Sequence, residues 1–159
     1  LSSITISEDV TEIGSYAFSD CNALETVTMS DSITYVGTYA FRNCKNLKTV
    51  RWSPNAITIL GNTFFGCSAL TEFVVPEGVV QIKDRAFWGC GNLESVTLPN
   101  SIVEIQDNAI SSTRIYSTYE NGLYLGTVEN PYLYLAKPIK TYITSIVVHP
   151  DTKIIGGRK

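Results

Sequence analysis

The spacing of the four cysteines constrains the fold more than any other feature of the sequence. They lie 23 residues apart each time, and a leucine follows each of them three residues later. A step repeated this strictly is the signature of a repeat protein, in which each unit stacks on the next. The cysteines are Cys21, Cys44, Cys67 and Cys90, and the leucines are Leu24, Leu47, Leu70 and Leu93.

Each repeat follows one template, which reads A-F-x-x-C-x-x-L-x-x-V-x-M in the first copy. The apolar residues at its end alternate with polar ones, and this period of two predicts a short strand with one buried face. The A-F-x-x-C-x-x-L part predicts a short helical turn, and residues 33–37 predict a second extended piece. Because one such coil cannot bury its own core, the coils must stack with parallel strands about 4.8 Å apart. The sequence therefore predicts an α/β solenoid of short parallel strands and short helical turns.

The template, followed by a proline or an acidic residue and then I-x-x-I-G, resembles the BspA-like branch of the leucine-rich repeat proteins over residues 1 to about 110. This resemblance implies a leucine-rich repeat solenoid. It also implies a secreted or surface-attached bacterial protein, since BspA-like proteins are typically of this kind in bacteria, with an expansion in some parasitic protists. They are associated with adhesion to host matrix and to other cells.

The repeat pattern divides the chain into three parts. Residues 1–116 are predicted to form the leucine-rich repeat solenoid, although the pattern weakens after Ile105. Residues 117–142 fit no repeat and predict an inserted β-hairpin, with strands at 123–126 and 132–137. Residues 143–159 resume the template and stop within it. Because both ends of the chain fall inside the template, we expect one continuous domain that is a segment of a longer protein.

Six of the nine tyrosines lie between residues 116 and 142. Aromatic residues are favoured in strands, and a hairpin laid over a solenoid needs large side chains to cover its seam. An exposed aromatic binding patch is the alternative, and the sequence leaves both open.

The charge of the chain disfavours two classes of partner. The formal net charge is -3 and the pI is near 5.1, without the basic stripe typical of proteins that bind nucleic acid or anionic membranes. No apolar run approaches the roughly 18 to 20 residues that a membrane-spanning helix needs. We therefore expect neither nucleic-acid binding nor membrane insertion by this segment.

The cysteine column admits four roles: disulfide, metal ligand, nucleophile or core residue. Stacking would place the Cβ atoms of adjacent cysteines about 5 Å apart, beyond the preferred disulfide distance of about 3.5 to 4.5 Å. No C-x-x-C pair is present to start a metal site, and a nucleophilic cysteine would need a nearby base. We expect buried free thiols, Cys21 included, that pack as small hydrophobes, and we expect no cofactor.

The single histidine, His149, does not suggest catalysis. It follows the last predicted strand, and no serine or cysteine is presented beside it and Asp151. It is expected at a solvated strand end, and we expect no enzymatic activity.

The outward positions of the predicted strands form two parallel columns dominated by Thr and Ser, and extended sheet faces of solenoids are common binding surfaces. A merely solubilising β face is the alternative, because Thr suits exposed strand positions. The candidate partner-binding residues are Thr26, Thr28, Thr49, Arg51, Glu72, Val74, Ser95 and Thr97.

Phe65 and Trp88 occupy one repeat position on the other side of the coil, where Ser19 and Arg42 stand in earlier copies. They are expected to form an exposed aromatic pair or to be covered by the insertion.

These features favour a non-catalytic adhesion or protein-binding module of an extracellular or cell-surface protein, which binds through the sheet face. The expected partner is a protein or a glycan, with host extracellular matrix among the candidates that the resemblance implies. The alternative is a structural spacer that projects other domains from the cell surface.

Overall fold

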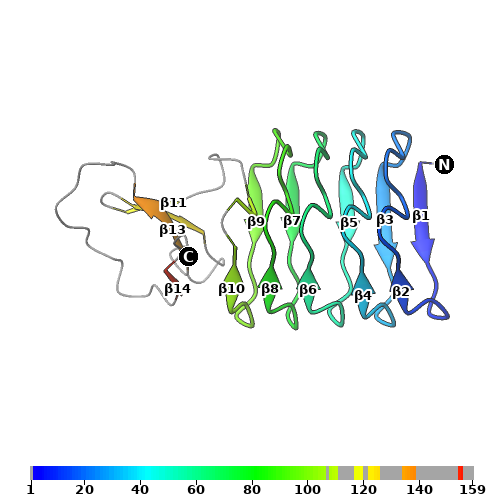
Figure 1. Cartoon of the computed structure of the whole chain (residues 1–159), viewed down its shortest axis with the longest axis horizontal. Coiled ribbons are helices and arrows are strands. Elements are labelled where there is room, and N and C mark those ends of the chain that lie inside the picture. Colours follow the sequence, from blue (N-terminus) through cyan, green and yellow to red (C-terminus); the bar gives the residue numbers. More distant parts are fainter. Residues whose placement is uncertain are drawn as a thin grey trace.

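The structure is a computed structural model that describes residues 2–106 and 108–110 and, for their backbone, four strands in the remainder of the chain. The described N-terminal part is a solenoid whose coils stack side by side along the long axis of the molecule (Figure 1). This arrangement confirms the solenoid that the 23-residue step predicts.

Each coil contributes one longer and one shorter strand, and the strands form two rows (Figure 1). We call these the long-strand row and the short-strand row. The long-strand row contains β1 (Ser3–Ile6), β3 (Thr26–Met29), β5 (Thr49–Arg51), β7 (Glu72–Val74) and β9 (Ser95–Thr97). The short-strand row contains β2 (Glu12–Ile13), β4 (Tyr35–Val36), β6 (Thr58–Ile59), β8 (Gln81–Ile82) and β10 (Glu104–Ile105).

The strand register equals the sequence repeat. Val27 of β3 lies opposite Ile4 of β1 on one side and Val50 of β5 on the other, in parallel ladders. Phe73 and Val96 are opposite each other in β7 and β9. Because each residue pairs with its equivalent in the next coil, every repeated position becomes a straight column along the solenoid.

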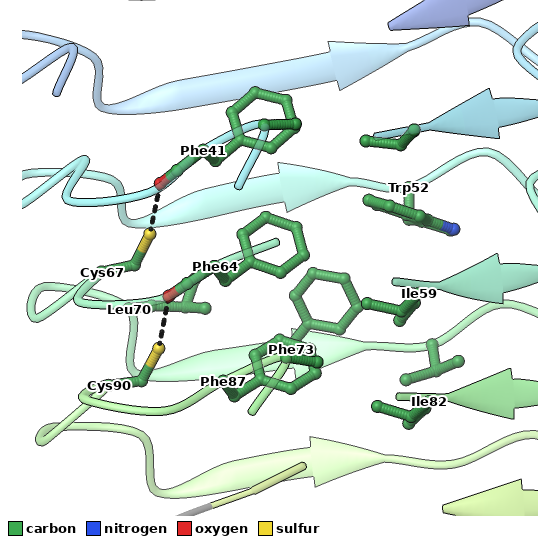
Figure 2. Close-up of a cluster of buried hydrophobic side chains, with 14 of the residues drawn as sticks. Phe41, Trp52, Ile59, Phe64, Cys67, Leu70, Phe73, Ile82, Phe87 and Cys90 are labelled. Carbon is green, nitrogen blue, oxygen red and sulfur yellow. Dashed lines mark hydrogen bonds between the residues drawn. The ribbon is translucent and has the colours of Figure 1, made fainter. Parts of the chain in front are cut away.

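Stacked phenylalanines form the centre of the core (Figure 2). The rings of Phe41 and Phe64 lie 5.5 Å apart, and those of Phe64 and Phe87 lie 5.3 Å apart, both nearly parallel. All three side chains are fully buried, and Phe73 and Trp52 pack against them edge-on or tilted. This ring column joins successive coils into one continuous core.

The coil that contains Trp52 differs from its neighbours. Trp52 stands where the other coils have a smaller residue such as Met29, and its indole Nε1 donates a hydrogen bond to the carbonyl of Ala56 at 3.0 Å. Ala56 in turn replaces the Ile33 of the preceding coil. The large side chain therefore occupies space that a small neighbour leaves free.

Both rows of strands are interrupted at this same coil. Within residues 2–106, hydrogen-bonded ladders join β1, β3 and β5, and separately β7 and β9. In the short-strand row, the ladder between β2 and β4 is separate from the one that joins β6, β8 and β10. The two interruptions thus fall on opposite sides of the Trp52 coil.

The predicted helical turn is wrong: among the described residues, the A-F-x-x-C-x-x-L segments contain turns and no helix. Some of their amides donate to the carbonyl three residues earlier, as Cys21 does to Phe18, while others donate to the next coil, as Phe18 does to Ala40. One residue with positive φ interrupts each segment, and these residues are Asp20, Asn43, Gly66 and Gly89. A helix needs continuous right-handed φ and intra-segment hydrogen bonds, and this backbone has neither.

Four strands are described beyond the solenoid: β11 (Ser117–Tyr119), β12 (Gly122–Leu125), β13 (Tyr134–Pro138) and β14 (Ile154–Ile155). The strands β11, β12 and β13 pair antiparallel in sequence order, as a hairpin insertion requires, and β14 pairs parallel with β13. In the resumed template, Ile155 has the position that Ile105 has in the last regular repeat, so the template would stack Ile155 on Ile105. The described ladder partner of Ile155 is instead Leu135. The boundaries 117–142 and 143–159 stay predictions, and Ile143, Ile146 and Val148 lie outside the described residues.

Candidate interaction surface

The eight candidate residues all lie on the outward side of the long-strand row, because the residues between them, such as Val27 and Phe73, are buried in the core. Their exposure is uneven. Thr49, Arg51, Glu72, Val74 and Ser95 are exposed, and Thr26, Thr28 and Thr97 are half-buried.

The ladders arrange these residues in two columns. In β3 and β5, Thr26 is opposite Thr49, and Thr28 is opposite Arg51. In β7 and β9, the corresponding pairs are Glu72 with Ser95 and Val74 with Thr97. The structure thus brings together the residues that the repeat predicts, with the ladder interruption between β5 and β7 in the middle of the surface.

Arg51 is not a free cation at the centre of this surface. Its Nη2 donates to Asp31 Oδ1 at 2.8 Å, and its Nη1 donates to the carbonyl of Met29 in the preceding coil. The guanidinium is therefore held toward the end of β3. Val74 is the most exposed apolar residue of the row, with 60% of its surface accessible. The centre of the surface is thus an apolar side chain beside the carboxylate of Glu72.

The buried cysteines act as hydrogen-bond donors between coils (Figure 2). The Sγ of Cys67 donates to the carbonyl of Phe41 at 3.1 Å, and that of Cys90 donates to Phe64 at 3.2 Å. Cys44 contacts Phe18 in the same way, at 3.0 Å. All three are buried free thiols, as predicted. Each thiol therefore satisfies a buried carbonyl in addition to filling its place in the core.

The prediction that Cys21 is buried is wrong, because its thiol is free and exposed. For each of the other cysteines, the preceding coil packs over the thiol and supplies the phenylalanine carbonyl that accepts its hydrogen bond. Cys21 lies in the first described coil, and in the structure it has neither. Whether a repeated residue is buried therefore depends on the neighbouring coil as well as on its own coil.

Alkaline pH is expected to destabilise the fold through these thiols. Burial raises the pKa of Cys44 to about 11 and that of Cys90 to about 12, and it also raises the pKa of Cys67. The folded chain thus retains protons that the unfolded chain loses above about pH 8.5. The stabilisation is complete below that pH and is lost as the pH rises through the folded values, at about 1.4 kcal/mol per pH unit for each thiol.

Urea unfolding at several pH values between 8 and 11 measures this loss. The variant Cys67→Ala is the control, and it should reduce the pH slope of the unfolding free energy by about a third, since it removes one of three buried thiols. An unchanged slope would mean that the thiols do not cause the alkaline loss.

The opposite side of each coil carries aromatic residues that the sequence only partly indicated. Trp88 is 40% exposed and Phe65 is half-buried, and no ring contact joins them in the described part of the chain. Instead, the guanidinium carbon of Arg85 lies 5.8 Å from the centroid of the Trp88 ring. Tyr16 and Tyr39 stack with their centroids 4.9 Å apart, a pair that their 23-residue separation could have indicated.

Within the described residues, no cluster of three or more His, Cys, Asp or Glu side chains could hold a metal ion. His149 and Asp151 lie outside them. Among the described residues, no helix long and apolar enough to cross a membrane is found.

A family model described as "BspA type Leucine rich repeat region" matches residues 1–116 in six copies. No curated protein matches the chain.

Several solved structures are similar to the chain. A leucine-rich cell surface protein from Faecalibacterium prausnitzii is 36% identical with a TM-score of 0.69, over 72% of this chain and 30% of that one. A leucine-rich repeat protein of T. pallidum is 26% identical with a TM-score of 0.69, over 72% and 56%. The pneumococcal vaccine antigen PcpA, at 17% identity and a TM-score of 0.59, shares the fold over 99% of this chain and 42% of its own. The chain thus spans between about a third and a half of these proteins.

Proposed function

The chain belongs to the BspA-type leucine-rich repeat family, and from this premise we propose that it is a non-catalytic protein-interaction module of a bacterial cell-surface protein. The outward columns of the long-strand row are the proposed binding surface. The similarity to a cell surface protein of F. prausnitzii supports the proposed location.

One observation carries the proposal: Val74 is 60% exposed near the middle of the long-strand row, in the column of Thr28, Arg51 and Thr97. A solubilising face has no need of an exposed branched apolar residue, and interface centres are typically apolar and surrounded by polar groups. The adjacent Glu72 and Ser95 are exposed and can supply hydrogen-bond acceptors and donors to a protein partner.

A charge placed on this surface should weaken partner binding. We expect Val74→Arg to reduce adhesion of the parent protein at least tenfold, because a cation would be buried at the interface centre. The matched control is Val103→Arg, since Val103 is 68% exposed on the short-strand side. Adhesion assays with folded variants that give equal losses, or none, would remove the support for this surface.

The second candidate function is a structural spacer, which the regular stacking of coils favours because it yields a stiff rod of fixed rise. Replacing residues 1–116 with an unrelated solenoid of equal length distinguishes the two functions. A spacer retains full activity of the parent protein after the replacement, whereas a binding module loses it.

A further inference from the structure

The turn segments of the coils form a second surface, made by residues 14–23, 37–46, 60–69 and 83–92, which we call the turn edge. Tyr16 is 53% exposed and stacks on Tyr39, while Trp88 is 40% exposed beneath the guanidinium of Arg85. Exposed tyrosine, tryptophan and arginine are the residues that most often dominate binding energy at protein interfaces. The composition of this edge therefore differs from the Thr and Ser columns of the long-strand row.

The backbone does not require these side chains. One repeated position of the turn edge has φ between 57° and 62° in every coil, and it holds Tyr16, Tyr39, Asn62, Arg85 and Asn108. Asparagine tolerates this left-handed conformation, whereas bulky side chains are disfavoured there. Two coils use the residue type that the backbone favours, and three use tyrosine or arginine instead. Tyr16 and Tyr39 stack on each other and Arg85 lies over Trp88, so these three residues build the exposed aromatic part of the edge.

Charge is unevenly distributed between the turn edge and the rest of the solenoid. Within residues 2–106, the turn edge holds four of the six Lys and Arg residues but only two of the eleven Asp and Glu residues. Lys83 is paired with Glu104 at 2.9 Å, Arg85 Nε lies 3.6 Å from Asp84 Oδ2, and Arg42 is half-buried, whereas Lys45 is exposed. The edge is thus a positive strip on a chain of net charge -3, and it is complementary to an acidic partner.

Several polar side chains that could recognise sugar hydroxyls already have hydrogen-bond partners within the fold. The Nδ2 of Asn43 donates to Asp20 Oδ1 at 2.9 Å, and that of Asn108 donates to Asp84 Oδ1 at 3.3 Å. Many turn amides donate to carbonyls of the next coil. The exposed rings of Tyr16 and Trp88 and the ammonium of Lys45 are what the edge still offers, and these suit apolar side chains and carboxylates.

We infer that the turn edge binds an acidic polypeptide segment that also carries aromatic or leucine side chains. The segment lies along the solenoid from Tyr16 to Trp88, with its apolar side chains against the rings. Its carboxylates lie toward Lys45 and, in competition with Asp84, toward Arg85. This surface is separate from the long-strand row and does not depend on the function proposed for that row.

Selection from a display library of random 12-residue peptides on the full 159-residue chain tests the inference. The enriched peptides should combine Asp or Glu with aromatic residues or leucine, and their affinity should fall as salt rises. For one synthetic enriched peptide, the double variant Arg85→Asn with Trp88→Ser should weaken binding at least tenfold. The fold should survive, because Asn62 and Ser19 occupy the equivalent positions in other coils.

Two further variants make the result decisive. Lys45→Glu reverses an exposed charge and should weaken the peptide at least threefold without altering the thermal midpoint, whereas Val74→Arg on the long-strand row should leave peptide affinity unchanged. Enrichment of non-acidic peptides, no enrichment, or equal affinity of the double variant would overturn the inference. Binding of an anionic polysaccharide to this edge in place of peptides would overturn it as well.

Discussion

Replacing Phe64 with alanine should destabilise the solenoid by about 3 to 5 kcal/mol. The ring is fully buried, and it contacts the rings of Phe41, Phe87, Trp52 and Phe73. Alanine leaves a cavity in the middle of the ring column, and the stacked coils on either side restrict how far the core can collapse into it. Urea denaturation followed by circular dichroism measures the change.

The neighbouring residue provides a matched control for this substitution. Phe65 is half-buried and makes no ring contact within the described part of the chain, so Phe65→Ala should cost less than half as much. Similar losses for the two variants would show that the ring column does not hold the coils together. A loss below about 1 kcal/mol for Phe64→Ala would do the same.

The second large effect is expected at the Trp52 coil, where the large side chain of Trp52 fills the space left by the small side chain of Ala56. Trp52→Met should destabilise the fold by about 2 kcal/mol or more, because it leaves a void in the core. Ala56→Ile should cost about 1 to 3 kcal/mol, because the added side chain collides with the indole. The double variant recreates the Met29 and Ile33 pair of the preceding coil, and it should recover most of the loss.

A double-mutant cycle measures this balance directly. We expect the double variant to lose at least about 1 kcal/mol less stability than the two single variants lose in sum, because the two side chains occupy the same space. Losses that simply add would show that Trp52 and Ala56 are independent. Amide hydrogen exchange on the same variants would report whether the strand ladders on both sides of this coil become continuous.

The repeat predicts most of the fold, because the stacking of equivalent residues is a direct physical consequence of a constant 23-residue step. It places Val27 and Phe73 in the core and Thr28 and Val74 outside, as observed. The helical turn was wrong because a stacked turn and a helix can share the same apolar spacing. Asn43, Gly66 and Gly89 were the available signal, since these residue types favour or permit positive φ.

Other features depend on side-chain geometry that spacing does not contain. The repeat cannot indicate that Arg51 pairs with Asp31, because a long side chain can reach several acceptors and local packing selects one. The ladder interruptions around Trp52 likewise depend on how one large ring is accommodated. The exposure of Cys21 goes with its place in the first coil of the structure, where no described coil packs on it, and a column of identical residues does not reveal this.

Site-specific photo-crosslinking on the parent protein tests the central proposal most directly, namely that the long-strand row is the binding surface. A photoreactive phenylalanine is placed at Thr28 or Val74 on that row, and at Tyr35 or Val103 on the short-strand side, where both residues are exposed. The account predicts crosslinks to a protein partner from Thr28 and Val74 and none from Tyr35 and Val103. Crosslinks only from the short-strand side, or equally from both sides, would contradict it.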